Sequence, residues 1–377
     1  MMVIRAFSNE KHEEDRFEKA NRNLRDTNLF VQRAMATMMP AMMLIMNGIT
    51  VLIMWNGAHG VDAGSMQVGD LMAFMQYTMQ IVMAFLMISM FSIMLPRASV
   101  SAGRIEEVLQ TEPVIRDPEQ TVSFDDAKRG LVEFKNVSFR YPGAEENVLE
   151  NISFTAKPGE TTAFIGSTGS GKSTLINLIP RFYDITEGEL LVDGADVRRV
   201  SQHDLRAKIG YVPQKGVLFS GTIASNLRYG NNDASQEELD KAAQIAQAAD
   251  FIGEKPDGFD SEISQGGTNV SGGQKQRLSI ARAIAIHPEI YIFDDSFSAL
   301  DYKTDVALRK ALKEETAGST VLIVAQRIST ILHAEQIIVL DEGKIVGKGT
   351  HKELLKTCEV YQQIAMSQLS KEELGNE

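Results

Sequence analysis

The residues with the clearest capacity for chemistry lie in one short stretch, GSTGSGKST, which directly follows the apolar run TTAFI. The stretch fits the pattern G-x-x-x-x-G-K-[ST], and this pattern requires the order strand, glycine loop, helix. Its glycines allow successive backbone N–H groups to point into one concavity and bind phosphate oxygens. Lys172 can reach the outer phosphates of a nucleotide, and Ser173 can offer its hydroxyl to Mg²⁺. The expected phosphate-binding residues are Gly166, Ser167, Thr168, Gly169, Ser170, Gly171, Lys172, Ser173 and Thr174.

A second apolar run, EIYIF, ends at two adjacent aspartates, Asp294 and Asp295. Asp294 stands at the end of the expected strand, where a carboxylate can contribute to the ligand shell of Mg²⁺. An apolar strand followed by an acidic residue is common and is weak evidence by itself. Downstream of a phosphate-binding loop, the same pattern indicates the second half of an ATPase magnesium site.

The stretch NVSGGQKQRLSIARAI begins with a Ser-Gly-Gly segment and continues as a helix. The free N–H groups and the dipole at the N-terminus of such a helix can bind an anion. The chain already has one phosphate-binding loop. A second anion-binding helix end is therefore suited to contact a nucleotide that is bound by a neighbouring nucleotide-binding domain. The residues of this helix start are Ser271, Gly272, Gly273 and Gln274.

In combination, these motifs resemble those of the ATP-binding cassette (ABC) transporters, specifically half-size exporters in which a membrane part is fused to a nucleotide-binding part. GSTGSGKST resembles the Walker A loop, Asp294 the Walker B aspartate, and SGGQ the family signature. Gln214 in YVPQ resembles the glutamine-loop residue that touches Mg²⁺, Tyr141 in FRYPG the aromatic residue that stacks on adenine, and Asp301 in ALD the D-loop aspartate. The resemblance implies ATP and Mg²⁺ as cofactors, with Ser173, Gln214 and Asp294 at the metal.

Two positions depart from the family pattern. Asp295 stands where the family has a catalytic glutamate, and Gln326 stands where it has a switch histidine. Aspartate is one methylene shorter than glutamate, and a misplacement of about 1 Å can slow a reaction about a hundredfold. Gln326 can donate a hydrogen bond to a phosphate, but it cannot carry a positive charge. Asp295 and Gln326 are therefore the catalytic candidates of a slow site.

The resemblance also implies a partner, because two cassettes of this family dimerise head to tail. Each ATP then lies between the Walker A loop of one cassette and the signature of the other. Both departures fall on the site built from this chain's own Walker motifs, whereas its signature is intact. We therefore expect a heterodimer in which a second half-transporter carries the hydrolytic site. Two alternatives stay open: a homodimer with two slow sites, and a decayed, inactive product.

The N-terminal third is apolar, and fifteen of the 18 methionines lie between Met35 and Met94. Two uncharged runs are each long enough for a helix that crosses a bilayer core of about 30 Å, with spans at about 31–55 and 71–95. Lys and Arg flank these runs on their outer sides and are missing from the loop between them, so both outer ends are expected in the cytoplasm. Seven methionines from Met72 to Met94 share one helical face. This face is either a packing seam or an adaptable lining for apolar substrates.

Patterning predicts a multidomain chain: an α-helical transmembrane hairpin, resembling a fragment of a type I exporter, followed by an α/β P-loop ATPase cassette with a helical subdomain. The expected boundaries are 1–105 for the partial transmembrane domain, 106–130 for a linker, 131–368 for the ABC nucleotide-binding domain and 369–377 for a C-terminal tail. The charged stretch Val3–Asn28 is expected to continue the first membrane helix. In the cassette we expect a mostly parallel sheet, one helix over QEELDKAAQIAQAADFI and a hairpin turn at Glu342-Gly343.

The expected function is that of an ATP-driven exporter subunit in the cell (plasma) membrane, multi-pass, with a cytoplasmic ATPase domain. The expected partners are a second ABC half-transporter, the lipid bilayer and an apolar or amphipathic small-molecule substrate. The net charge of −12 argues against nucleic acid, and the single cysteine, Cys358, excludes an internal disulfide. A non-transporting ATPase of the same superfamily and an importer are competing functions, and the two fused spans oppose both. Because an exporter half of this family has six membrane helices, the resemblance implies that the first four lie outside this sequence.

Overall fold

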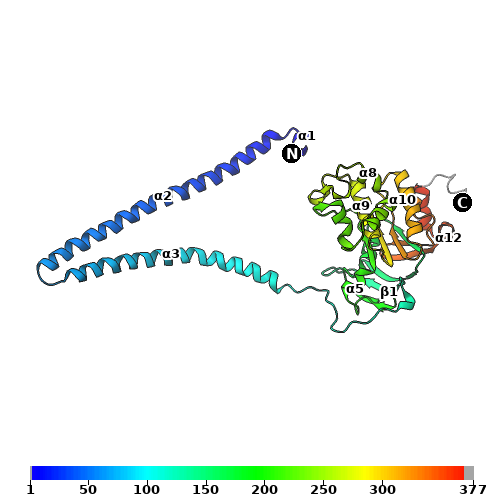
Figure 1. Cartoon of the computed structure of the whole chain (residues 1–377), viewed down its shortest axis with the longest axis horizontal. Coiled ribbons are helices and arrows are strands. Elements are labelled where there is room, and N and C mark those ends of the chain that lie inside the picture. Colours follow the sequence, from blue (N-terminus) through cyan, green and yellow to red (C-terminus); the bar gives the residue numbers. More distant parts are fainter. Residues whose placement is uncertain (1, 369–377) are drawn as a thin grey trace. The chain divides into compact units, whose positions relative to one another are not determined.

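The computed structural model describes residues 2–368, so the predicted C-terminal tail, 369–377, lies outside the described residues. The chain divides into two compact units, with the boundary between Glu112 and Pro113. The first unit is a helical hairpin and the second is an α/β domain (Figure 1). A helical region followed by an α/β cassette is the predicted fold class.

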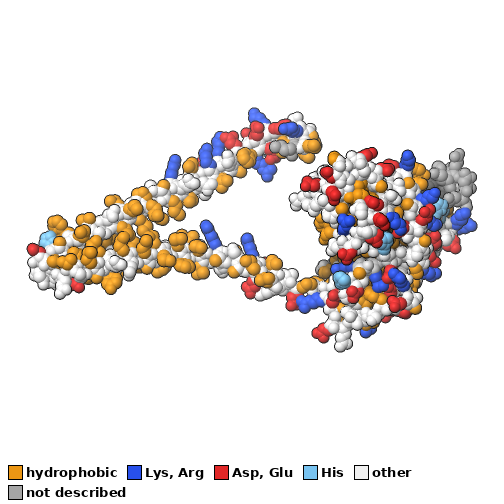
Figure 2. Space-filling model, viewed as in Figure 1, with side chains coloured by type: hydrophobic (Ala, Val, Ile, Leu, Met, Phe, Trp, Pro, Cys, Tyr) orange, Lys and Arg blue, Asp and Glu red, His pale blue; other side chains and the backbone are white. Residues whose placement is uncertain are grey.

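The helical unit consists of α1 (Met2–Ala6), α2 (Glu10–Asp62) and α3 (Val68–Gln110). α2 and α3 contain the two predicted spans, and both are long and apolar enough to cross a membrane. Their hydrophobic side chains cover the surface of the hairpin, while charged side chains gather on the N-terminal part of α2 (Figure 2). This distribution suits helices whose surroundings are lipid or other membrane helices.

The two long helices approach closely at Gly57 of α2. A Cβ atom at this position would lie 2.1 Å from Cδ1 of Leu71 in α3, so a larger residue would force the Leu71 side chain to move. Each helix also contains a proline, Pro40 in α2 and Pro96 in α3. Membrane helices tolerate proline because neighbouring groups can satisfy the freed backbone carbonyl.

Two helix boundaries differ from the sequence-based expectation. The chain bends at Ser8, which has a φ of 50°, so the helix expected over Val3–Asn28 is split and its long part begins at Glu10. At the other end α3 continues to Gln110, past the expected start of the linker at residue 106.

A six-stranded sheet of order β12-β11-β3-β10-β9-β6 forms the centre of the α/β unit. All neighbouring strands are parallel except β12, which pairs antiparallel with β11. Short runs of Val, Ile and Leu that are buried on both faces favour this arrangement. The β11–β12 hairpin turns at Glu342 and Gly343, as predicted, and both residues have a positive φ. The strands are β3 (Thr161–Gly166), β6 (Ile209–Val212), β9 (Ile290–Asp294), β10 (Thr320–Val324), β11 (Gln336–Asp341) and β12 (Lys344–Gly349).

A second, antiparallel sheet of order β2-β1-β4-β5 was not part of the sequence-based prediction. Its strands are β1 (Val132–Phe139), β2 (Leu149–Ala156), β4 (Glu187–Val192) and β5 (Ala195–Asp196). β4 crosses β1 closely at Gly188, where a Cβ atom would lie 2.3 Å from the carbonyl oxygen of Asn136. A two-stranded pair, β7 (Gly221–Thr222) and β8 (Glu262–Ile263), completes the strands of the described residues.

The helices of the cassette cover the sheets and form the predicted helical subdomain. The helix expected over QEELDKAAQIAQAADFI is in fact two helices, α7 and α8, because Gln247 between them has a φ of 56°. The α-helices are α4 (Lys172–Leu178), α5 (Gln202–Ala207), α6 (Ile223–Leu227), α7 (Gln236–Ile245), α8 (Ala249–Gly253), α9 (Gly272–Ile284), α10 (Tyr302–Glu315), α11 (Ile328–Ile331), α12 (His351–Thr357) and α13 (Glu359–Gln368). The 3₁₀ turns are η1 (Asp126–Lys128), η2 (Arg228–Gly230), η3 (Gly258–Asp260) and η4 (Gln265–Gly267).

Two hydrophobic cores lie on opposite faces of the six-stranded sheet. Ile292 of β9 belongs to the core that also contains the residues of β1 and β2, whereas its neighbour Phe293 belongs to the core formed with α7, α9 and α10. Successive side chains of a strand point to opposite faces, so β9 joins both cores. The site residues at the end of β9 are thereby fixed from two sides.

Candidate functional site

The loop between β3 and α4 has the geometry of a phosphate cradle. Gly166 has a φ of 155°, and a Cβ atom there would lie 2.0 Å from the carbonyl oxygen of Leu340. Gly171, with a φ of 95°, directly precedes α4. Lys172 Nζ donates to the carbonyl oxygens of Gly166 (3.0 Å) and Ser167 (2.7 Å), so the ammonium group is held against the loop. Both glycines are required by backbone conformation as well as by space.

Ser173 and Asp294 meet beside this loop. Ser173 lies in the first turn of α4 and Asp294 is the last residue of β9. Ser173 Oγ donates to Asp294 Oδ1 at 2.9 Å. Mg²⁺ is usually held by one or two carboxylates together with phosphates of a nucleotide. A carboxylate and a hydroxyl next to a phosphate cradle fit this ion, and they are the two residues that would hold it here.

Asp295 follows β9 directly and has a φ of 47°, a conformation that aspartate adopts more readily than most residues with a side chain. Its Oδ2 accepts a hydrogen bond from Gln326 Nε2 at 2.6 Å and another from Gln214 Nε2 at 3.3 Å. The structure therefore brings together three residues that the sequence singled out separately. Two neutral amides, rather than a cation, hold the carboxylate.

Burial controls the electrostatics of this cluster. Asp294 and Asp295 are only 6% and 7% exposed, and burial raises the pKa of both. The neighbouring carboxylate of Asp295 raises the pKa of Asp294 further. Burial also lowers the pKa of Lys172, and the two carboxylates act in the opposite direction. Two adjacent buried carboxylates disfavour their own charge, and a bound cation would relieve this cost.

Replacing Asp294 with Asn should stabilise the nucleotide-free chain while weakening Mg²⁺-dependent ATP binding. Because the folded-state pKa of Asp294 is above the unfolded value, the ionised group opposes folding at neutral pH, and the penalty disappears as the pH falls through the folded pKa. We expect the melting temperature of Asp294→Asn at pH 7.5 to rise by about 2 °C, and the gain to shrink toward pH 4. Scanning fluorimetry of the nucleotide-free chain measures this. The exposed Asp233→Asn is the control, and a melting temperature for Asp294→Asn at or below that of the parent would contradict the argument.

Tyr141 lies beside the helix that follows the phosphate loop. Its hydroxyl oxygen is 3.0 Å from Thr174 Oγ1, and its ring packs edge-on against Phe139 (4.9 Å between centroids) and Tyr183 (5.1 Å). The ring is half-buried and fixed by aromatic neighbours, which suits a surface on which a base can stack.

The signature residues do not join this cluster within the chain. Ser271 caps α9 and forms a reciprocal capping box with Gln274: Ser271 Oγ accepts from the Gln274 amide at 3.2 Å, and Gln274 Oε1 accepts from the Ser271 amide at 2.9 Å. Asp301 caps α10: its carboxylate accepts from the Thr304 amide at 3.0 Å and from the Thr304 hydroxyl at 2.7 Å. Within residues 2–368, no hydrogen bond joins Ser271 or Gln274 to the phosphate loop. The start of α9 is therefore available to a different nucleotide.

Sequence reasoning missed Gln276, which fixes the loop that carries Gln214. Gln276 is 1% exposed. Its Oε1 accepts from the Gly216 amide at 2.9 Å, and its Nε2 donates to the Pro213 carbonyl at 3.1 Å. The two contacts flank Gln214 and tie its loop to α9. The only sequence signal is a polar residue on the buried face of a helix, and this signal does not name its partner.

Comparison with known proteins identifies the class of both units. Residues 149–298 match the family model described as ABC transporter, and residues 1–85 match the one described as ABC transporter transmembrane region. An uncharacterized ABC transporter ATP-binding protein of Mycobacterium tuberculosis is 47% identical over 369 residues, which cover 97% of this chain and 63% of that protein. An ATP-dependent lipid A-core flippase of Pseudomonas fluorescens is 38% identical over 354 residues, which cover 94% of this chain and 58% of that protein.

Among solved structures, a bacterial Atm1-family ABC exporter with ATP bound matches with a TM-score of 0.82 and 33% identity, covering 98% of this chain and 64% of that one. The chain thus spans a little under two thirds of the length of these relatives. Both units are ABC transporter sequence, a helical transmembrane region followed by an α/β ABC ATPase domain. The order of the two units along the chain, a transmembrane region followed by an ATPase domain, is similar to that of the Atm1-family ABC exporter.

Proposed function

We propose that this chain is a subunit of an ATP-driven exporter in the plasma membrane. It binds Mg²⁺-ATP at a degenerate site of low turnover, and it supplies its signature to the hydrolytic site of a second half-transporter. Ser173 and Asp294 hold the metal, Gln214 approaches it, and Tyr141 stacks on the base. The second nucleotide, bound by the partner, is contacted by the signature at the start of α9 and by Asp301.

The observation that carries this proposal is the state of Asp295. A general base must reach the water that attacks the outer phosphate, and geometry is the first requirement for that role. Here the shorter carboxylate is held by the amides of Gln326 and Gln214. A neutral glutamine at position 326 also cannot offset developing negative charge as a histidinium can. Both properties favour a bound nucleotide that turns over slowly.

The signature supports the other half of the proposal. Ser271 and Gln274 form an intact capping box at the start of a 13-residue helix, α9. The N-terminus of such a helix favours an anion through its free N–H groups and its dipole. The catalytic pair Asp295 and Gln326 is impaired, whereas the anion-binding start of α9 is intact. This combination suits an asymmetric dimer in which the nucleotide bound by the partner is the one hydrolysed.

We assign apolar or amphipathic molecules as the transported class. The methionine face of α3 is exposed within its unit at Met72, Met83 and Met90, among others, and flexible thioethers repack around differently shaped molecules. The relatedness to a lipid A-core flippase supports an amphipathic lipid as one such substrate.

A homodimer with two slow sites is the second candidate. It is favoured by the raised pKa of Asp295, since burial makes this carboxylate a better proton acceptor than an ordinary aspartate. The two candidates differ in whether Asp295 contributes to the turnover of the physiological complex.

Paired substitutions in the two-subunit complex test the proposal. Replacing the partner's catalytic glutamate with glutamine should reduce the ATPase rate to background, whereas Asp295→Asn should leave it within about twofold of the parent. Asparagine keeps the left-handed backbone conformation and one acceptor oxygen for the two glutamines, so this substitution removes the charge and the second acceptor oxygen. Phosphate release is the measurement. If Asp295→Asn alone silences the complex, the asymmetric assignment is wrong and the homodimer is favoured.

A further inference from the structure

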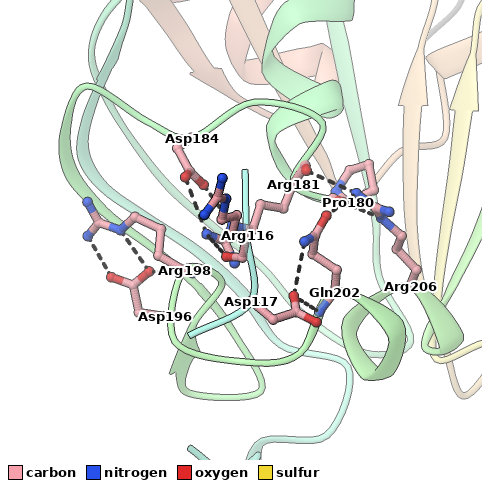
Figure 3. Close-up of polar contacts among 9 residues, drawn as sticks. All are labelled: Arg116, Asp117, Pro180, Arg181, Asp184, Asp196, Arg198, Gln202 and Arg206. Atoms are coloured by element: carbon pink, nitrogen blue, oxygen red, sulfur yellow. Dashed lines mark hydrogen bonds and ion pairs between the residues drawn. The ribbon is translucent and has the colours of Figure 1, made fainter. Parts of the chain in front are cut away.

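The chain that follows α3 is fastened to the cassette within a few residues of the unit boundary. The carbonyl oxygen of Arg116 accepts a hydrogen bond from Arg181 Nη2 at 3.2 Å. The carboxylate of Asp117 accepts from the backbone amide of Gln202 at 2.9 Å and from Gln202 Nε2 at 3.0 Å (Figure 3). We call Arg116 and Asp117 the linker anchor. Its two residues are held by two separate elements, the turn after α4 and the start of α5.

Arg181 is built into the cassette rather than displayed on its surface. It is 4% exposed and has a φ of 53°, which is uncommon for a residue with a long side chain. Its guanidinium forms a two-point ion pair with Asp184, Nε to Oδ1 at 2.7 Å and Nη2 to Oδ2 at 3.3 Å. A two-point pair between a buried guanidinium and a half-exposed carboxylate has a fixed geometry. The same Nη2 atom also reaches the linker anchor.

Arg206 closes the network from the other side. Its Nη2 donates to Gln202 Oε1 at 3.0 Å and to the Arg181 carbonyl at 3.2 Å, and its Nε donates to the Pro180 carbonyl at 3.0 Å. Figure 3 shows Gln202 between Asp117 and the Arg206 guanidinium. The turn Pro180–Asp184 is therefore connected to the linker anchor through Arg181 directly and through Gln202 and Arg206.

The same turn contacts the nucleotide site. Phe182 packs edge-on against Tyr211, whose hydroxyl donates to Asn177 in α4 at 2.9 Å. Tyr183 packs edge-on against Tyr141, the residue proposed to stack on adenine. Two successive aromatic side chains thus join the turn to the helix after the phosphate loop and to the base-stacking ring.

We propose that Arg181 is a positioning residue that links docking of the linker anchor to nucleotide binding in this chain. With the anchor docked, the turn holds Tyr183 and Phe182 against the nucleotide site; with it released, the turn loses one of its supports. Energetic coupling between two sites is reciprocal, so nucleotide binding must favour docking to the same extent. The inference rests on the proposed function, because it assumes that this chain binds ATP. Through this coupling, nucleotide binding in the cassette would be sensed by the linker segment that follows α3 in the chain.

The docked state does not depend on a narrow pH range. The backbone hydrogen bond from Gln202 lowers the pKa of Asp117, followed by the side-chain hydrogen bond from the same residue. The carboxylate is therefore ionised at neutral pH. Both contacts from Gln202 reach the same oxygen, Oδ1, and the amide of asparagine also has one acceptor oxygen.

Nucleotide affinity of the full chain, purified in detergent, tests the coupling. The probe is a fluorescent trinitrophenyl derivative of ATP with Mg²⁺. Asp117→Ala removes the exposed carboxylate that accepts from Gln202, whereas Arg181→Gln removes the buried guanidinium that donates to the neighbouring Arg116 carbonyl. We expect both to weaken binding about fivefold, the lower end of typical coupling. Asp117→Asn keeps an acceptor oxygen and should restore the parent affinity.

A matched control comes from the same surface. Arg198 pairs with Asp196 at 2.6 Å and donates to the Gly188 carbonyl at 3.3 Å, so Arg198→Gln should leave the affinity unchanged. Hydrogen exchange provides a second readout that a purely structural role would not move. The Gln202 amide, which donates to Asp117, should exchange about fivefold more slowly when a non-hydrolysable ATP analogue is bound. This protection should vanish in Arg181→Gln.

The outcomes separate this inference from the proposed function. If the parent chain binds the probe and Asp117→Ala and Arg181→Gln bind it equally well, the coupling is absent and only this inference is overturned. The same conclusion follows if the hydrogen-exchange rate of the Gln202 amide does not change when the ATP analogue binds. If the parent chain itself does not bind Mg²⁺-nucleotide, the proposed function is overturned, and the coupling with it.

Discussion

Ser271→Arg should lower the ATPase rate of the two-subunit complex about a hundredfold, the loss typical of removing a donor that stabilises developing charge. In the proposed arrangement the start of α9 faces the outer phosphate of the nucleotide bound by the partner. Arginine removes the hydroxyl that caps α9 and places a long side chain where the phosphate would approach the helix end. Phosphate release by the complex, measured at saturating Mg²⁺-ATP, gives the change.

The chain provides a close structural control for this substitution. Ser235 caps α7 with the same reciprocal capping box, formed there with Glu238. Ser235→Arg therefore costs the cassette a comparable cap, about 1 kcal/mol, without touching a proposed nucleotide contact. We expect its ATPase rate to stay within about twofold of the parent. Equal losses for the two variants would mean that Ser271 acts through folding, and the shared-site assignment would fail.

The phosphate-binding half of the site could be predicted from the sequence because its parts are contiguous or sit at strand ends. Gly166 and Gly171 need backbone conformations and close approaches that only glycine provides, so the sequence carries their signal directly. Asp294 follows a run of buried strand residues, and parallel neighbours bring such ends to one edge of a sheet. At these residues the local sequence pattern predicts the same place in the fold that the structure shows.

The remaining parts depend on contacts that no local pattern encodes. The antiparallel sheet was missed because strands such as Glu187–Val192 mix polar residues with apolar ones and pair with partners far along the chain. α7 and α8 were read as one helix because the break at Gln247 comes from a left-handed backbone conformation, not from proline or glycine. Gln276 and Arg181 were missed for a similar reason. A single buried polar residue reveals its role only when its partner is in place.

The paired substitution Asp295→Glu with Gln326→His should raise the hydrolysis rate at this chain's own site, measured in the two-subunit complex whose partner has its catalytic glutamate replaced with glutamine. Glutamate restores the reach that aspartate lacks by one methylene, and a placement error of about 1 Å costs about a hundredfold. The neutral Gln326 amide now donates a hydrogen bond to Asp295 Oδ2 at 2.6 Å. A histidine at this position removes that amide and can carry positive charge near the phosphate. We therefore expect a rise of up to about a hundredfold in phosphate release.

The backbone around position 326 favours this result, because it is fixed independently of the side chain. Gln368 Nε2 donates to the Gln326 carbonyl at 2.9 Å, and Gln368 Oε1 accepts from the Ile328 amide at 2.8 Å. A histidine at 326 would therefore start from the position that the glutamine now has. Glutamate at 295 is less favourable, since its backbone φ of 47° suits aspartate better, and the variant should melt slightly earlier.

The two single substitutions define what the double variant measures. Asp295→Glu alone leaves Gln326 to hold the longer carboxylate, and Gln326→His alone leaves the carboxylate short, so each should gain less than tenfold. A gain in the double variant larger than the product of the single gains would show that positions 295 and 326 act as a unit. Lys172→Ala in the double background should abolish the gained activity and so excludes contaminating ATPases. A double variant no faster than the parent would mean that the low turnover has another cause than this pair.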